Sequence, residues 1–160
     1  DEININQSPF SKIKNFGWPI SSYGEHYKKN YSKEKLAQAP LNKSHKKFGF
    51  IEPIKYFVPS IGISSLNNCP KILNNYYKKP CLMALSLYGN NLRKGYSIVI
   101  FLLNDELNKI DSLEKISLNN LVLRHFVTDQ KNKLYEDNNG DIYISVDKKG
   151  IYRVSFENFR

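Results

Sequence analysis

The stretch PCLMALSLYGNNLRKGYSIVIFLL, residues 80–103, decides the fold prediction. Its second part, GYSIVIFLL, is a near-continuous apolar run, typical of a strand that is covered on both faces. Its first part, CLMALSLYG, predicts a helix that ends at Gly89, because four residues have the i, i+3, i+4, i+7 spacing of one helix face: Cys81, Ala84, Leu85 and Tyr88. The stretch therefore predicts a helix followed by a buried strand.

The chain before this stretch predicts helices and irregular segments. Residues 25–39 predict a short polar helix that Pro40 ends, and residues 70–79 predict another. Between them, FGFIEPIKYFVP is apolar and aromatic, but Pro53 and Pro59 restrict it to an edge strand or an extended segment.

The chain after this stretch predicts antiparallel strands. Residues 104–119 are polar, with a short helix expected near 111–116. Strands are expected at 121–129 and 133–137, and DIYISV-DKKG-IYRVSF predicts a closing hairpin. The fold prediction is therefore α+β, with N-terminal helices and irregular segments packed on a C-terminal antiparallel β-sheet.

The length of 160 residues predicts a single domain, 1–160, with a basic part (1–79) and a part that carries the helix and sheet (80–160). No apolar run approaches the roughly 18 to 20 residues of a membrane-spanning helix, so no span is expected. The chain starts at Asp1 without a signal peptide, which fits a mature exported protein or a domain cut from a longer one.

The charge is uneven along the chain. The net charge is +9, and residues 1–79, with 13 lysines and 5 acidic residues, carry +8 of it. This basic half predicts contact with an acidic partner, such as an inhibitor or immunity protein, with nucleic acid, or with an anionic membrane surface. The competing interpretation is that the lysines only keep the surface soluble.

Three residues form a candidate catalytic set. Cys81 opens the predicted helix, where unpaired amides and the helix dipole lower a thiol pKa. His125 lies on the apolar face of a predicted strand and could act as the base. Asp137 ends the adjoining strand and could orient the imidazole.

On PCLMALSLYGNNLRKGYSIVIFLLND and LRHFVTDQKNKLYEDNNG, residues 80–140 resemble papain-like and transglutaminase-like cysteine enzymes, including small bacterial toxin-type versions. The resemblance implies a papain-like core with Cys81 as nucleophile, His125 as base and Asp137 as orienting group. It also implies an amide hydrolase, deamidase or acyl transferase that acts on a protein or peptide, such as a secreted toxin or effector domain delivered into a target cell.

Two other functions remain open on the sequence. The first is an exported, non-enzymatic binding, inhibitor or immunity domain with a Cys69–Cys81 disulfide, which would place the protein in the periplasm or outside the cell. The second is a basic nuclease that uses His26 and His45. We expect no cofactor and no metal, because the sequence has no Walker loop, zinc-ligand spacing, EF-hand loop or Gly-rich dinucleotide loop.

Overall fold

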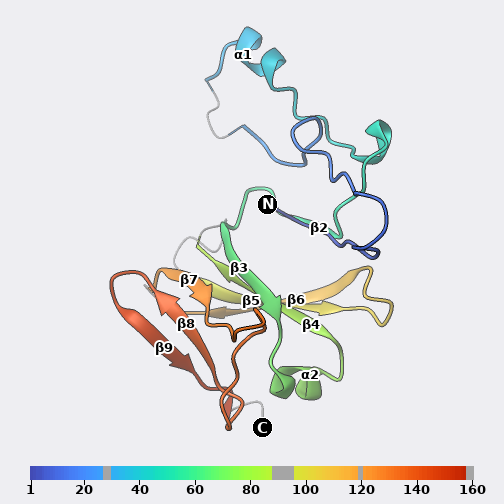
Figure 1. Cartoon of the computed structure of the whole chain (residues 1–160). Helices are drawn as coiled ribbons and strands as arrows, with labels where there is room; N and C mark the ends of the chain where they lie inside the picture. Colours follow the sequence, from blue (N-terminus) through green and yellow to red (C-terminus); the bar gives the residue numbers. More distant parts are fainter. Residues whose placement is uncertain (27–29, 88–95, 119–120, 158–160) are drawn as a thin grey trace. The chain divides into compact units, whose positions relative to one another are not determined.

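The computed structural model describes residues 1–26, 30–87, 96–118 and 121–157 (Figure 1). The chain divides into two compact units, residues 1–60 and residues 61–160. Each unit is described on its own. Among the described residues, none of the helices has the length and apolarity needed to cross a bilayer.

Unit 1, residues 1–60, contains little regular structure. Strand β1 (Glu2–Ile3) pairs antiparallel with β2 (Lys55–Tyr56), in the segment that Pro53 and Pro59 keep short. Helix α1 covers only Lys33–Gln38, and the side chain of Ser32 caps it by accepting a hydrogen bond from the Lys35 amide. The 3-10 helix η1 (Lys46–Phe48) follows. The chain is otherwise held by turns and side-chain hydrogen bonds.

Unit 2, residues 61–160, contains a four-stranded antiparallel sheet in the order β3-β4-β5-β6. Its strands are β3 (Ile63–Asn68), β4 (Cys81–Ser86), β5 (Ser97–Leu103) and β6 (Ile110–Ser117). Helix α2 (Lys71–Tyr77) links β3 to β4. The predicted buried strand is confirmed, since β5 lies between β4 and β6 and nearly all of its side chains are buried.

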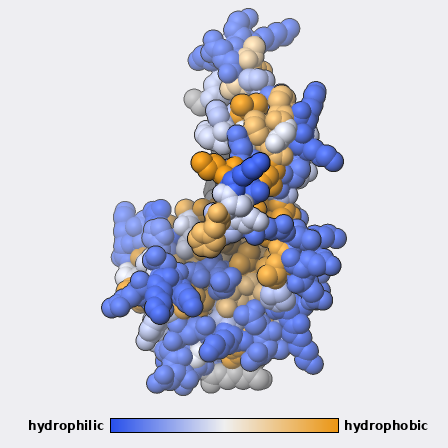
Figure 2. All heavy atoms as spheres, turned by 45° about the vertical axis from the view of Figure 1, so that its right-hand side comes forward, coloured by the Kyte–Doolittle hydropathy of each residue, from blue (hydrophilic) through white to orange (hydrophobic). Residues whose placement is uncertain are grey.

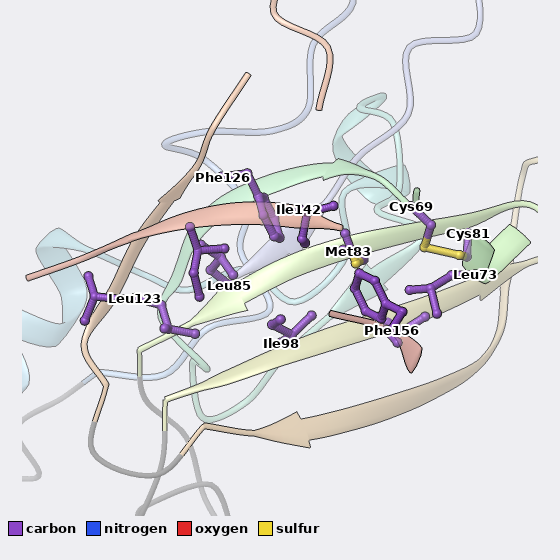
Figure 3. Close-up of a cluster of buried hydrophobic side chains, with 13 residues drawn as sticks. Cys69, Leu73, Cys81, Met83, Leu85, Ile98, Leu123, Phe126, Ile142 and Phe156 are labelled. Atoms are coloured by element: carbon purple, nitrogen blue, oxygen red, sulfur yellow. A yellow bond between two sulfur atoms is a disulfide. The ribbon is translucent and has the colours of Figure 1, made fainter. Parts of the chain in front are cut away.

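A second sheet of unit 2 has the order β7-β8-β9 and consists of β7 (Leu123–Phe126), β8 (Ile142–Val146) and β9 (Gly150–Val154). The predicted closing hairpin corresponds to β8 and β9. Both sheets and α2 contribute to one buried apolar cluster (Figure 3), whose labelled members are Cys69, Leu73, Cys81, Met83, Leu85, Ile98, Leu123, Phe126, Ile142 and Phe156.

The predicted α+β class and the papain-like core are wrong, because the structure is mostly antiparallel sheet. The segment CLMALSLYG was predicted as a helix, but Cys81–Ser86 is the strand β4, paired on both sides with β3 and β5. Residues 111–116, predicted as a short helix, lie within the edge strand β6. Residues 133–137 form only isolated bridges, Thr128 with Leu134 and Glu136 with Ile142.

Candidate functional site

A small pocket lies in unit 1, between the start of the chain and the segment FGWPISSYG, residues 16–24. Its volume is about 230 Å³. Its lining combines two carboxylates, two hydroxyls and two aromatic rings: Asp1, Glu2, Phe16, Trp18, Ser21, Ser22 and Gly24. Trp18 is 84% exposed, so its ring is open to a ligand rather than packed in a core.

His45 contacts two of the residues that line this pocket and is only 1% exposed. Its Nδ1 lies 2.9 Å from the Oγ of Ser21, and its Nε2 lies 3.1 Å from Oε1 of Glu2. With Nε2 protonated, the ring donates to the Glu2 carboxylate and accepts from the Ser21 hydroxyl, which satisfies both nitrogens. Two residues of the pocket lining are therefore fixed by one buried imidazole.

The backbone at Gly17 packs closely against the His45 imidazole, which is possible because glycine has no side chain. Its φ is +94°, in the region that favours glycine, and a Cβ at this position would overlap Nδ1 of His45 and Oγ of Ser21. The amides of Ile20 and Ser21 both donate to the Gly17 carbonyl, which closes the turn that presents Trp18. The sequence Gly-Trp-Pro thus places an exposed aromatic residue next in the chain to the glycine that packs on the buried His45.

Tyr23 and Glu52 form a second polar pair, which is connected to the pocket residue Glu2. The Tyr23 hydroxyl donates to Oε2 of Glu52 at 2.6 Å, and the Tyr23 amide donates to Oε1 of Glu2 at 3.3 Å. The bond to Glu52 raises the pKa of Tyr23 to about 12. Burial opposes ionisation of Glu52, but hydrogen bonds from the Tyr23 hydroxyl and the Lys46 amide outweigh it, so the pKa of Glu52 lies below its usual value.

Ser21, His45 and Glu2 have the residue types of a serine-hydrolase triad, but the surrounding amides do not suit that chemistry. The amides of residues 20–24 all donate within the protein: to the carbonyls of Gly17 and Asn42, to Glu2, and to the Ser22 hydroxyl. None of these five amides is left to stabilise an oxyanion. The geometry therefore assigns the network a positioning role.

The structure places the predicted nucleophile in a different chemical state. Cys81 is joined to Cys69 by a disulfide with an S–S distance of 2.00 Å. It begins a strand rather than a helix, and its side chain is buried. The disulfide leaves Cys81 without the free thiol that a nucleophile needs.

The other two predicted residues lie on the β7–β8 part of unit 2. His125 is exposed on β7, and its amide donates to the Ser145 hydroxyl at 3.1 Å. Asp137 accepts hydrogen bonds from the Tyr143 hydroxyl and from the amides of Asn139 and Asp141. Burial opposes its ionisation, but these bonds lower its pKa overall. As individual site residues, His125 and Asp137 stay a prediction from the sequence.

A comparison with known protein families finds a match that includes the whole of unit 1. Residues 1–99 match the family model described as Glucose / Sorbosone dehydrogenase, which covers all of unit 1 and the first strands of unit 2. The chain belongs to the glucose/sorbosone dehydrogenase family. Within unit 2, the matched residues include β3 and β4 of the four-stranded antiparallel sheet β3-β4-β5-β6. Neither the curated proteins nor the solved structures contain a match to the chain.

The family match contradicts the functions that were predicted from the sequence. The cysteine-dependent amide hydrolase, deamidase or acyl transferase is wrong, as is its assignment to papain-like toxins or effectors. The inhibitor or immunity domain and the nuclease with His26 and His45 are likewise not supported. His45 is buried between Ser21 and Glu2, and His26 contacts the ring of Tyr31. The alternative Cys69–Cys81 disulfide does form, and it is compatible with an extracellular or periplasmic location.

The sequence reasoning overlooked the pocket residues of unit 1. Glu2 and Ser21 have no local pattern that marks them, because their partner His45 is 43 and 24 positions away. A usable signal was present in FGWP, where the chain's single tryptophan follows a glycine and precedes a proline. Glycine and proline on either side favour a turn, and an aromatic ring exposed by a turn can contact a ligand.

Proposed function

We propose that this chain takes part in the oxidation of a sugar, and that the pocket of unit 1 forms part of the sugar-binding site. The observation that carries the proposal is the family match over residues 1–99, because it includes every residue that lines the pocket. The Cys69–Cys81 disulfide supports an extracellular or periplasmic place for this activity.

The lining of the pocket suits a sugar ring. A sugar has apolar C–H faces and polar hydroxyl edges, and the pocket offers aromatic rings at Phe16 and Trp18 beside polar groups at Glu2 and Ser22. The volume of about 230 Å³ is below the roughly 300–1,000 Å³ typical of drug-sized ligands. A monosaccharide is therefore a better match in size than a larger ligand.

Among the lining residues, Glu2 has the best-defined group for a hydrogen bond with the sugar. Both protein donors, Nε2 of His45 and the amide of Tyr23, contact Oε1, and no donor among the described residues contacts Oε2. Oε2 is thus the oxygen that accepts a hydrogen bond from a sugar hydroxyl. The Ser22 hydroxyl accepts from the Gly24 amide and can donate to a neighbouring sugar oxygen.

In a sugar dehydrogenase, the oxidised carbon gives up its hydrogen together with two electrons, a hydride equivalent, to a two-electron acceptor, and its hydroxyl gives up a proton as the C=O bond forms. The residues of unit 1 act on the sugar side of this reaction. His45 orients Glu2 and, through Ser21 and the turn at Gly17, holds Trp18 at the mouth of the pocket. The network therefore fixes the sugar in one orientation, and correct orientation lowers the barrier of the chemical step.

Calorimetric titration with D-glucose tests the proposal. Glu2→Gln keeps the shape of the side chain and removes its charge, so we expect binding to weaken about tenfold, the effect of losing a charged hydrogen bond. Glu25→Gln is the matched control, because Glu25 is an exposed carboxylate of the same unit that does not line the pocket. Absence of glucose binding, or equal weakening by both variants, would contradict the proposal.

A further inference from the structure

A short loop of unit 1, Ser8–Lys14 with the sequence SPFSKIK, exposes two large apolar side chains. Phe10 and Ile13 are both fully exposed to solvent. The loop is nevertheless ordered locally, because the amide and hydroxyl of Ser11 both donate to the Ser8 carbonyl and the Ser8 amide donates to the Asn6 side chain. We call this segment the 8–14 loop. It presents its apolar side chains from a defined turn.

The charge of the same segment is uniformly positive. Lys12 and Lys14 lie on either side of Ile13, and the sequence from residue 3 to residue 24 contains neither Asp nor Glu. Apolar side chains are exposed among hydrophilic ones on the molecular surface (Figure 2). In the 8–14 loop, Lys12 and Lys14 flank Ile13, and Phe10 lies two positions before Lys12, so any surface that accepts the loop must tolerate apolar groups and attract cations.

We propose that the 8–14 loop docks the protein on an anionic lipid surface. An aromatic and an aliphatic side chain can enter the boundary between headgroups and acyl chains, while lysine ammonium groups remain at the level of the lipid phosphates. Each lysine near an anionic bilayer contributes about 1 kcal/mol, which corresponds to roughly a fivefold change in affinity. In this contact the protein lies on the surface of the bilayer and does not cross it. The proposal does not depend on the sugar-binding proposal.

A lipid surface suits the loop better than a macromolecular partner does. A stable protein interface buries about 800 Å² on each partner, which is more than the tip of a seven-residue loop can offer. Single-stranded nucleic acid is bound by stacking on aromatic rings, which Ile13 cannot provide. A bilayer requires neither a matching patch nor a stacking partner, only apolar tips beside positive charges.

Co-sedimentation of the whole chain with vesicles tests the proposal. We expect binding to phosphatidylglycerol/phosphatidylcholine vesicles, with much weaker binding to phosphatidylcholine alone and a decline as salt rises. Phe10→Ser with Ile13→Ser should lower the partition coefficient at least about tenfold. Lys12→Glu with Lys14→Glu should lower it at least about 25-fold, since each position loses an attractive charge.

A matched control separates the loop from the net charge. Lys148→Glu with Lys149→Glu makes the same change in charge on the exposed β8–β9 turn of unit 2, and should leave binding within about twofold. Because the loop side chains are fully exposed, the loop variants should melt like the wild type. Three results would overturn the proposal: no binding to anionic vesicles, equal loss in the control, or full binding by the Phe10/Ile13 variant. Binding of an acidic protein without vesicle binding would also overturn it.

Discussion

Nε2 of His45 lies 3.1 Å from Oε1 of Glu2, which ties the segment before η1 to strand β1 across 43 positions of the chain. The other ring nitrogen holds Ser21 at 2.9 Å. One buried imidazole therefore links the two sides of the pocket, and the stability of unit 1 and the shape of the pocket depend on the same side chain.

Replacing His45 with Ala should strongly destabilise unit 1. The change removes a buried ring and leaves Ser21 and Glu2 without their shared partner, so we expect a loss of about 2–4 kcal/mol in the free energy of unfolding. Hydrogen exchange at increasing urea, measured at the amides of residues 20–24, reports on this unit, because all five are hydrogen-bonded within it. His26→Ala is the control, because among the described residues this change removes a ring contact with Tyr31 and no part of the His45 network. Equal, small losses in both variants would show that the network is not important for stability.

Replacing Gly17 with Ala should cost more than the same change at Gly49. Both glycines have positive φ, +94° and +76°. An alanine is strained in this conformation, so each variant should lose about 1 kcal/mol in the free energy of unfolding. A Cβ at Gly49 meets nothing within 4 Å, whereas a Cβ at Gly17 overlaps His45 and Ser21. We expect an additional loss of about 1–3 kcal/mol for Gly17→Ala. Equal melting temperatures for the two variants would contradict the close packing of the turn on His45.

The Tyr23–Glu52 pair should make stability depend on pH. The pKa of Glu52 is lowered in the folded protein, so its contribution is complete above the usual value of 4.5 and is lost as the pH falls through the folded pKa. The pKa of Tyr23 is raised, so its contribution is complete below 10.0 and is lost as the pH rises towards about 12. Unfolding free energy measured against pH should fall at both ends. Glu52→Gln should reduce the pH dependence of the unfolding free energy at both the acidic and the alkaline end. An unchanged pH dependence in this variant would show that the Tyr23–Glu52 pair is not its source.

Reduction of the Cys69–Cys81 disulfide should destabilise unit 2. The two cysteines are 12 positions apart, and the entropy of closing a loop of that length predicts a loss of about 3 kcal/mol. Denaturant unfolding of the wild type and of Cys69→Ser with Cys81→Ser gives the difference. The native protein should also resist iodoacetamide at both cysteines. Rapid labelling of Cys81 without reductant would show that the disulfide does not form in the protein.

Much of the sheet in unit 2 could be predicted from local sequence. The run SIVIFLL predicts a doubly covered strand, and DKKG between two alternating segments predicts the β8–β9 hairpin, as found. The error at residues 81–86 has a clear cause. Met83, Ala84 and Leu85 are buried one after another, so no alternation of apolar and polar residues reveals the period of two, and an apparent helical spacing remains.

The edge strand β6 and the pocket depended on information that local sequence does not contain. Ile110–Ser117 is mainly exposed, and its strand state follows from pairing with β5 rather than from its own polar sequence. His45 stands among lysines and resembles a surface residue, but contacts with Ser21 and Glu2 bury it. The prediction of Cys81 as a nucleophile failed because its position on a helix was assumed, and because Cys69 lies beside it in the fold.

The fluorescence of Trp18 during titration with D-glucose tests the central claim most directly. The chain has one tryptophan, it is 84% exposed, and it lines the pocket, so the emission reports on this site alone. The account predicts a saturable shift of the emission to shorter wavelength with glucose, none with glycerol, and a weaker response in Glu2→Gln. An emission spectrum that stays unchanged up to saturating glucose, or that responds equally to glycerol, would contradict the assignment of this pocket as part of a sugar site.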